Sequence, residues 1–204
     1  DTTDGRRRAN GMGLSNQTRA LFNGGYSPGT VNTIDFITIA QTGNAVDYGD
    51  LTVARESGAC CASPTRGIIS GGRNQPANNA LSSIDFVTIP SLGNAQDFGD
   101  LTVARFATQS CSNSTRGLIF AGSTPGNSNI IDFITIATTG DATDFGDTIA
   151  AMQYPLGAVA SPTRGVLGGG LSPSALNTIQ YVAIPTQGNA IDFGDLQHSK
   201  SEAS

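Results

Sequence analysis

Apolar and polar residues alternate along short stretches of the chain in the pattern of β-strands. Within TIDFITI, which spans residues 33–39, the alternation places Ile34 and Phe36 on one face and Asp35 and Ile37 on the other. β-Branched and aromatic residues dominate this stretch, and clusters of Gly, Pro and Asn bound it, as is typical of a strand. Both faces are largely apolar, which predicts a sheet covered on both sides. No helical period extends beyond about two turns, so the pattern predicts an all-β fold.

These stretches recur at regular intervals. The pair Thr-Arg stands at residues 18–19, 65–66, 115–116 and 163–164, in steps of 47, 50 and 48 residues. Each pair precedes an apolar stretch that ends in small residues, then TIDFITI or a variant, and then GNAVDYGD or a variant. A period of about 48 residues is typical of β-propeller blades. A blade packs between two neighbours, which also accounts for the two apolar faces of its strands.

Each repeat unit supplies enough residues for four strands. In the second unit we place strand a at residues 58–62, strand b at 67–70, strand c at 83–89 and strand d around 99–104. The sequence therefore predicts one domain, an all-β propeller with four blades of four antiparallel strands. The predicted blades cover about residues 9–55, 56–105, 106–152 and 153–200.

Both ends of the chain fall at the same phase of the repeat. TTDGRRR near the N-terminus and DLQHSK near the C-terminus each align with DLTVAR of the complete units. Two ends therefore compete for one position. We expect a closed four-bladed disc, because four blades leave no orphan strand. The alternative is a segment of a larger propeller or repeat array.

At these positions the chain resembles the kelch repeat. That repeat has a strand ending in Gly-Gly, an aromatic residue in each of the next two strands, and a closing Arg. The matching residues are Gly24-Gly25, Gly71-Gly72 and Gly169-Gly170; Phe36, Phe86, Phe133 and Tyr181; Tyr48, Phe98, Phe145 and Phe193; and Arg55 and Arg105. The second aromatic is Trp in most kelch repeats, and the closing Arg is missing from the last two units. The amino-acid sequence of the repeat is also similar to that of kelch-like repeats in virion structural and tail-fibre proteins of bacteriophages, especially marine ones.

The composition argues against several classes of function. The formal net charge of −5 argues against a protein that binds nucleic-acid phosphates. The single His, His198, gives little support for a Ser-His-Asp or Cys-His mechanism. No apolar run approaches the roughly 18 residues of a membrane span and no signal peptide opens the chain, so we expect no membrane insertion. Some kelch propellers are enzymes, but the Tyr and His metal ligands of the oxidases have no match here. We expect no catalytic residue, cofactor or metal.

Charged residues at repeated positions favour a structural role. An Asp-aromatic-Gly-Asp motif in every unit would suit a calcium loop, but it lacks the alternating acidic residues and terminal Glu of an EF-hand. We instead expect these aspartates to cap turns and to form one ion pair per blade with the Arg of Thr-Arg. The residues assigned to this role are Arg19, Arg66, Arg116 and Arg164 with Asp50, Asp100, Asp147 and Asp195. The basic run at residues 6–8 is expected to be solvated.

The three cysteines do not describe a disulfide framework, because their number is odd. Cys61 and Cys111 fall at the same phase of consecutive units, which leaves a cross-blade disulfide as an alternative. We expect both, with Cys60, to serve as small buried hydrophobic residues. No CxxC or Cys/His cluster supports a zinc site.

The loops at the two ends of the predicted disc differ. The a–b and c–d turns share one end, where Thr-Arg and Gly-Asn-Ala recur almost unchanged, whereas the b–c and d–a connections vary in length and composition. Variable polar loops on a rigid scaffold commonly carry recognition, although they also occur as permissive connections. The candidate binding residues are Tyr26, Arg73, Asn74, Gln75, Asn78, Asn79, Phe106 and Tyr154.

The resemblance to kelch-like phage repeats implies a non-enzymatic structural protein of a phage virion, in a tail fibre or a surface decoration. Its expected partners are other virion proteins or a host-surface glycan, and we expect a symmetric homo-oligomeric assembly without nucleic acid. The alternative is a secreted or cell-surface bacterial binding module. A kelch-type enzyme is the third hypothesis.

Overall fold

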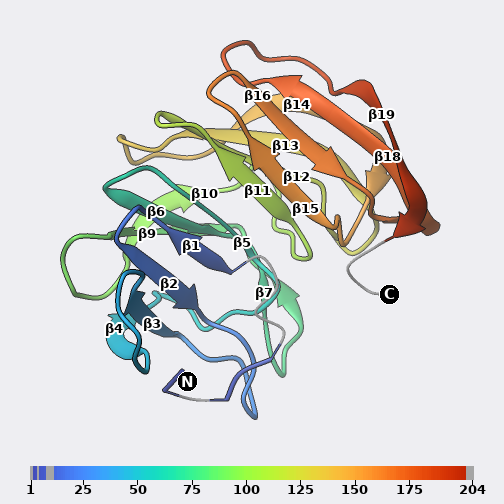
Figure 1. Cartoon of the computed structure of the whole chain (residues 1–204). Coiled ribbons are helices and arrows are strands. Elements are labelled where there is room, and N and C mark those ends of the chain that lie inside the picture. Colours follow the sequence, from blue (N-terminus) through green and yellow to red (C-terminus); the bar gives the residue numbers. More distant parts are fainter. Residues whose placement is uncertain (1, 4, 8–11, 201–204) are drawn as a thin grey trace.

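The structure is a computed structural model that describes residues 2–3, 5–7 and 12–200. The described residues form strands, turns and loops without a helix. Four antiparallel sheets are arranged as the four blades of a β-propeller (Figure 1). The prediction of an all-β, four-bladed propeller is therefore confirmed.

Each blade consists of four strands, a to d, in chain order. Blade 1 contains β1 (Gly13–Ser15), β2 (Arg19–Asn23), β3 (Thr33–Thr38) and β4 (Val46–Asp50). Blade 2 contains β5 (Ala59–Ala62), β6 (Arg66–Ser70), β9 (Ser83–Thr88) and β10 (Gln96–Asp100). Blade 3 contains β11 (Gln109–Ser112), β12 (Arg116–Phe120), β13 (Ser128–Thr135) and β14 (Thr143–Met152), and blade 4 contains β15 (Gly157–Ala160), β16 (Arg164–Gly168), β18 (Ser174–Ala183) and β19 (Ile191–Lys200). Short strands β7 (Arg73–Asn74) and β8 (Asn79–Ala80) form a hairpin, and β17 (Leu171–Ser172) pairs with β18.

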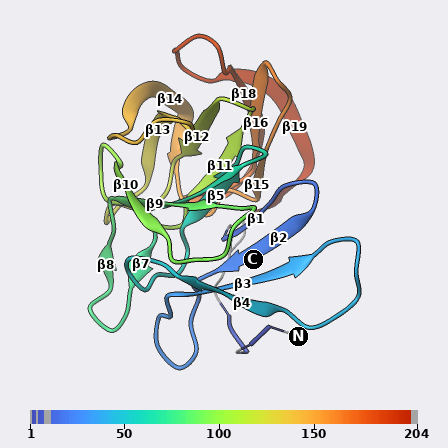
Figure 2. The ribbon, with the colours of Figure 1, turned by 90° about the vertical axis from the view of Figure 1, so that its left-hand side faces the viewer.

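The a strands lie innermost, around the propeller axis (Figure 2). β1 lies beside β5, β5 beside β11, and β11 beside β15. Three hydrophobic cores fill the spaces between consecutive blades: one between blades 1 and 2, one between blades 2 and 3, and one between blades 3 and 4. The described residues form no such core between blades 4 and 1. Four blades are present as predicted, but the residues that the structure describes do not seal the disc at this last junction.

A repeated contact at the outer strands explains the GNA and FGD motifs. At Gly49 the backbone φ is +144°, and an added Cβ would lie 2.6 Å from the Gly93 carbonyl oxygen of blade 2. The Gly93 amide donates to the Tyr48 carbonyl oxygen at 3.0 Å, and the Asp50 amide donates to Asn94 Oδ1 at 3.0 Å. Gly140, Asp141, Gly188 and Asn189 repeat these contacts at the next two junctions. We call this contact the outer latch.

Strand d begins earlier than predicted. In blade 2 it spans Gln96–Asp100, and residues 101–105 leave the sheet for the next blade. The cause is a buried aspartate in blade 3: Thr102 donates its amide and hydroxyl to Asp132, at 3.1 and 2.6 Å, and Arg105 forms a 3.0 Å ion pair with it. Both side chains of this pair are fully buried.

The same buried pair occurs at the preceding blades. Arg55 binds Asp85 at 3.0 Å and also donates to the Ser83 and Gly71 carbonyl oxygens. Burial lowers the pKa of Arg55, and the Asp85 carboxylate opposes that shift. On blade 1, Arg6 of the N-terminal segment pairs with Asp35. The Arg6 side chain is only 5% exposed, which corrects the expectation that this residue is solvated. Arg7 is exposed as expected, and Arg8 lies outside the described residues.

The predicted pairing between the Thr-Arg arginines and the repeated aspartates is wrong. Arg19, Arg66, Arg116 and Arg164 stack on Phe36, Phe86, Phe133 and Tyr181 of their own blades, with 4.3–5.0 Å from guanidinium to ring centroid. The first three arginines also donate to the backbone carbonyl oxygens of Ile89, Ile136 and Ile184 in the next blade, at 2.9–3.0 Å. Asp50, Asp100, Asp147 and Asp195 form no ion pair among the described residues. These guanidinium groups stay in contact with water, because the four arginines are half-buried or exposed, so the position works without an acidic partner.

The cysteines lie on the a strands, and all three are free. Cys61 and Cys111 are buried as predicted, and Cys60 is half-buried. An added Cβ at Gly117 would lie 2.7 Å from Cys61 Sγ, so the Gly after Thr-Arg makes room for the side chain of the preceding blade. Burial raises the pKa of the Cys61 and Cys111 thiols to about 12, which keeps them neutral.

Candidate functional site

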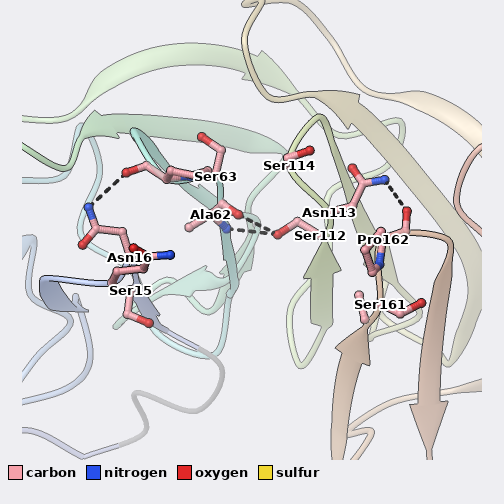
Figure 3. A pocket seen from close by; sticks show the side chains of 12 residues that line it. Ser15, Asn16, Ala62, Ser63, Ser112, Asn113, Ser114, Ser161 and Pro162 are labelled. Carbon is pink, nitrogen blue, oxygen red and sulfur yellow. Dashed lines mark hydrogen bonds between the residues drawn. The ribbon is translucent and has the colours of Figure 1, made fainter.

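The two ends of the propeller axis offer different surfaces. At the a–b turns, a hollow of about 500 Å³ is open to solvent. Each blade contributes three residues to its wall, and the lining is made of small polar residues with Ala and Pro (Figure 3). We call this surface the turn end and the opposite surface, formed by the b–c and d–a connections, the loop end.

Several polar groups at the turn end are used within the scaffold. Asn16 Oδ1 accepts the amides of Thr18 and Arg19, and its Nδ2 donates to the Pro64 carbonyl oxygen of blade 2. Asn113 repeats this arrangement toward Pro162 (Figure 3). Ser63 and Ser161 cap the corresponding turns of blades 2 and 4. The repeated turn residues therefore account for turn geometry and blade packing.

At the loop end, Arg73 joins two blades. Its Nε donates to Glu56 Oε1 at 3.0 Å, its Nη1 donates to Asn78 Oδ1 at 3.2 Å, and its guanidinium lies 4.6 Å from the ring centroid of Phe106. Glu56 is fully buried, so the ion pair is largely shielded from water. Arg73 thus fixes the base of the β7–β8 hairpin against the connection between blades 2 and 3.

Further contacts connect this hairpin to blade 1. The Thr30 hydroxyl donates to the Gln75 carbonyl oxygen at 3.3 Å, and the Gln75 amide donates back to that hydroxyl at 3.2 Å. Thr30 also pairs through its backbone with Tyr26, whose ring lies 5.1 Å from the Arg7 guanidinium. The b–c loops of blades 1 and 2 therefore form one continuous surface.

Tyr154 joins the same surface from blade 4. Its amide donates to the Ala107 carbonyl oxygen at 3.1 Å, and the Ala107 amide donates to the Ser57 carbonyl oxygen at 2.8 Å. All three residues have left-handed φ angles of 51–55°. These backbone bonds link three blades at the loop end.

The tip of the hairpin is the most accessible part of the loop end. Residues 76–79 are exposed, whereas Arg73, Asn74 and Gln75 are half-buried. The Asn74 Oδ1 atom is buried and has no hydrogen-bond partner among the described residues. Gln75 Nε2 donates to Asn78 Oδ1, which keeps two amide side chains together. Such a surface offers hydrogen-bond donors and acceptors without net charge at its tip.

The eight predicted binding residues are therefore not scattered. Seven of them lie on the connected loops of blades 1 to 3. The eighth, Tyr154, is joined to these loops by the hydrogen bond from its amide to the Ala107 carbonyl oxygen. Sequence reasoning missed the pairing of Asp35, Asp85 and Asp132 with Arg6, Arg55 and Arg105. A usable signal was present, because both partners are lost together at the junction between blades 3 and 4, where Met152 and Gln180 stand instead.

Two further features were sought among the described residues: clusters of metal-ligating side chains and helices long enough to span a membrane. No three or more His, Cys, Asp or Glu side chains there are placed to hold a metal ion. None of the described segments is a helix able to cross a membrane. The chain matches no protein-family model, and no curated protein matches it significantly.

Proposed function

We propose that this chain is a non-enzymatic recognition module, and that its loop end binds a glycan on a host-cell surface. The setting we propose is a phage virion, in a tail fibre or surface decoration, because the repeats resemble kelch-like repeats of such proteins. The observation that carries the proposal is the contrast between the two ends. The turn end repeats its residues and uses them within the scaffold, whereas the loop end carries divergent residues held in a connected surface.

The chemistry of the hairpin tip favours a glycan. Asn78 and Asn79 are exposed, and Thr30 holds the backbone of the loop at Gln75. Asn78 Oδ1 already accepts bonds from Arg73 and Gln75, so Asn78 offers its N–H groups and Asn79 offers a whole amide. Amide side chains both donate and accept hydrogen bonds, as sugar hydroxyls do. A rigid loop also loses little conformational entropy when it binds. A virion protein as the partner is the other outcome that the test can return.

The proposal is tested by binding of the labelled chain to an array of bacterial surface oligosaccharides. The test variant is Gln75→Ala with Asn79→Ala at the loop end, and the matched control is Gln17→Ala with Ser114→Ala at the rim of the turn end. We expect glycan binding that the first variant weakens at least about tenfold and the control leaves unchanged.

The results of the oligosaccharide-binding test that would contradict the proposal are as follows. Binding to no oligosaccharide, or equal loss in the test and control variants, contradicts the proposal. Cross-linking of the loop end to a neighbouring protein in purified particles would assign the surface to virion assembly instead.

A further inference from the structure

The three closed junctions share one design, and it defines two faces on every blade. The trailing face packs on the next blade and includes the aromatic residue before Gly-Asp; the leading face packs on the preceding blade and includes the Ile after strand c. Tyr48 and Ile89 occupy these positions at the first junction, within one hydrophobic core. Phe98 with Ile136, and Phe145 with Ile184, repeat the arrangement.

The trailing face of blade 4 and the leading face of blade 1 are open. Phe193 is 56% exposed, whereas its counterparts Tyr48, Phe98 and Phe145 are 2–3% exposed. Ile39 is 50% exposed, whereas Ile89, Ile136 and Ile184 are at most 1% exposed. Phe22 is 40% exposed, although Ile69, Ile119 and Leu167 at the same position are buried. Each open face thus exposes apolar groups that three other copies of the same position bury.

We propose that these two faces bind each other between two copies of this chain, head to tail. The partner surface is the leading face of blade 1 in a second copy, and it meets the trailing face of blade 4. The support is continuity with an interface already formed three times within the chain. The two open faces are its two unused halves, because they hold the same positions with the same apolar character.

Polar groups for the outer latch are also in place. Gly194 has a φ of +139°, like Gly49, and nothing lies within 4 Å of an added Cβ there. At the closed junctions, the turn containing Gly93 or Gly188 fills this space. Arg164 stacks on Tyr181 as its counterparts do, but it donates to no backbone carbonyl of another blade among the described residues. The Gly43 turn and the Ile39 carbonyl oxygen of a second copy would complete these contacts.

Ala20 explains why blade 1 of the same chain does not complete them. In blades 2 to 4 this position is Gly67, Gly117 or Gly165, and an added Cβ would lie 2.7–2.9 Å from a side chain of the preceding a strand. The counterpart side chain in blade 4 is Val159. The Cβ of Ala20 occupies the space that a glycine leaves for this side chain at the other three junctions. If the outer latch forms while the a strands stay farther apart, the two blades meet at a smaller angle than at the other junctions. A smaller angle does not close a ring of four blades.

The N-terminal segment already compensates the buried carboxylate on the leading face of blade 1. Thr3 donates its hydroxyl to Asp35 Oδ1 at 2.7 Å, and Arg6 pairs with the same carboxylate. These residues take the places of Thr52 and Arg55 at the next junction. The buried Asp35 is therefore compensated within its own chain, and docking needs no charged group from the C-terminal segment of the second copy.

The first test is the mass of the intact chain by sedimentation equilibrium over a wide concentration range. We expect association, because a heterologous contact of this kind builds rings or filaments. Phe193→Asp and Ile39→Asp should each weaken association about tenfold or more, since both residues are exposed in the single chain and variants should fold. Leu92→Asp is the matched control, because Leu92 is 57% exposed and its counterparts in the other blades are Thr42, Thr139 and Gln187. A single chain at all concentrations, or equal effects of all three variants, overturns the proposal.

A second test separates association from closure within one chain. Asn44→Cys and Asp195→Cys chains are mixed and oxidised, so that only contact between copies can join the two new thiols. Asp50→Cys with Asn94→Cys in one chain is the positive control, since these residues touch at the first junction. We expect a two-chain product in the mixture. If the Asn44→Cys/Asp195→Cys double variant cross-links only within single chains, the disc closes on itself and the proposal is wrong. Neither test involves a glycan, so both are independent of the proposed function.

Discussion

The junction between blades 2 and 3 and the junction between blades 3 and 4 solve the same problem with different chemistry. At the first, Arg105 and Asp132 form a fully buried ion pair, and Thr102 completes the hydrogen bonds of the carboxylate. At the second, Met152 and Gln180 occupy the corresponding positions, and the Ile149 amide donates to Gln180 Oε1 at 2.8 Å. The charged and neutral junctions each form a hydrophobic core.

This difference shows how to recognise scaffold positions in a repeat. The Arg and the Asp change together, since either one alone would leave an uncompensated charge in a buried site. The length of strand d also differs between the two junctions. Without the Arg–Asp pair, β14 continues in the sheet as far as Met152, whereas β10 ends at Asp100. Divergence with a compensating partner therefore belongs to the scaffold, and the exposed residues of the β7–β8 hairpin show no such compensation.

The largest effect is expected when only one partner of the charged junction is removed. Arg105→Met leaves Asp132 buried with the hydrogen bonds of Thr102 but without a countercharge. The expected loss of unfolding free energy is about 3–5 kcal/mol. Denaturant unfolding measures it, and a loss below about 1 kcal/mol would show that the pair is not shielded from water.

Conversion of the whole junction should be much milder. Arg105→Met, Asp132→Gln and Thr102→Ile together copy the neutral junction into the charged one. Because no buried charge remains, we expect the variant to regain most of the lost stability, to within about 2 kcal/mol of the parent. If the combined variant unfolds as easily as Arg105→Met alone, the two junctions are not equivalent.

A smaller effect is expected at the outer latch, which both junctions share. Asn189→Ala removes the acceptor for the Asp147 amide at 3.0 Å and should cost about 1 kcal/mol. Thr139→Ala in the turn of the preceding blade is the control, because this residue is exposed and should change stability by less than about 0.5 kcal/mol. If Asn189→Ala and Thr139→Ala lower stability equally in thermal or denaturant unfolding, the outer latch does not stabilise the fold.

The sequence predicts the repeated parts of this fold well, for a physical reason. Strands b and c, the blade number and the turn residues follow from patterns that recur four times, so chance matches are averaged out. The Arg–Asp pairing cannot be read from the repeat pattern, because the two partners lie in different blades. The open faces of blades 1 and 4 depend on contacts between units, and only Ala20, in place of a repeated Gly, marks them in the sequence.

The central claim is that repeated residues build the scaffold and divergent loop residues bind the partner. It is tested most directly by exchanging residues 74–79 for a Gly/Ser linker of the same length. Loop length is unchanged and Asn78 has a left-handed φ of 54°, so the unfolding free energy should change by less than about 1 kcal/mol.

The decisive measurement compares two variants, this loop variant and Asn189→Ala. It measures the affinity of each for the oligosaccharide that the array identifies. The account predicts that the loop variant folds and loses binding, whereas Asn189→Ala is less stable and binds like the parent chain. Unchanged binding by the loop variant, with binding abolished in a folded Asn189→Ala chain, would place recognition at the turn end and contradict the account.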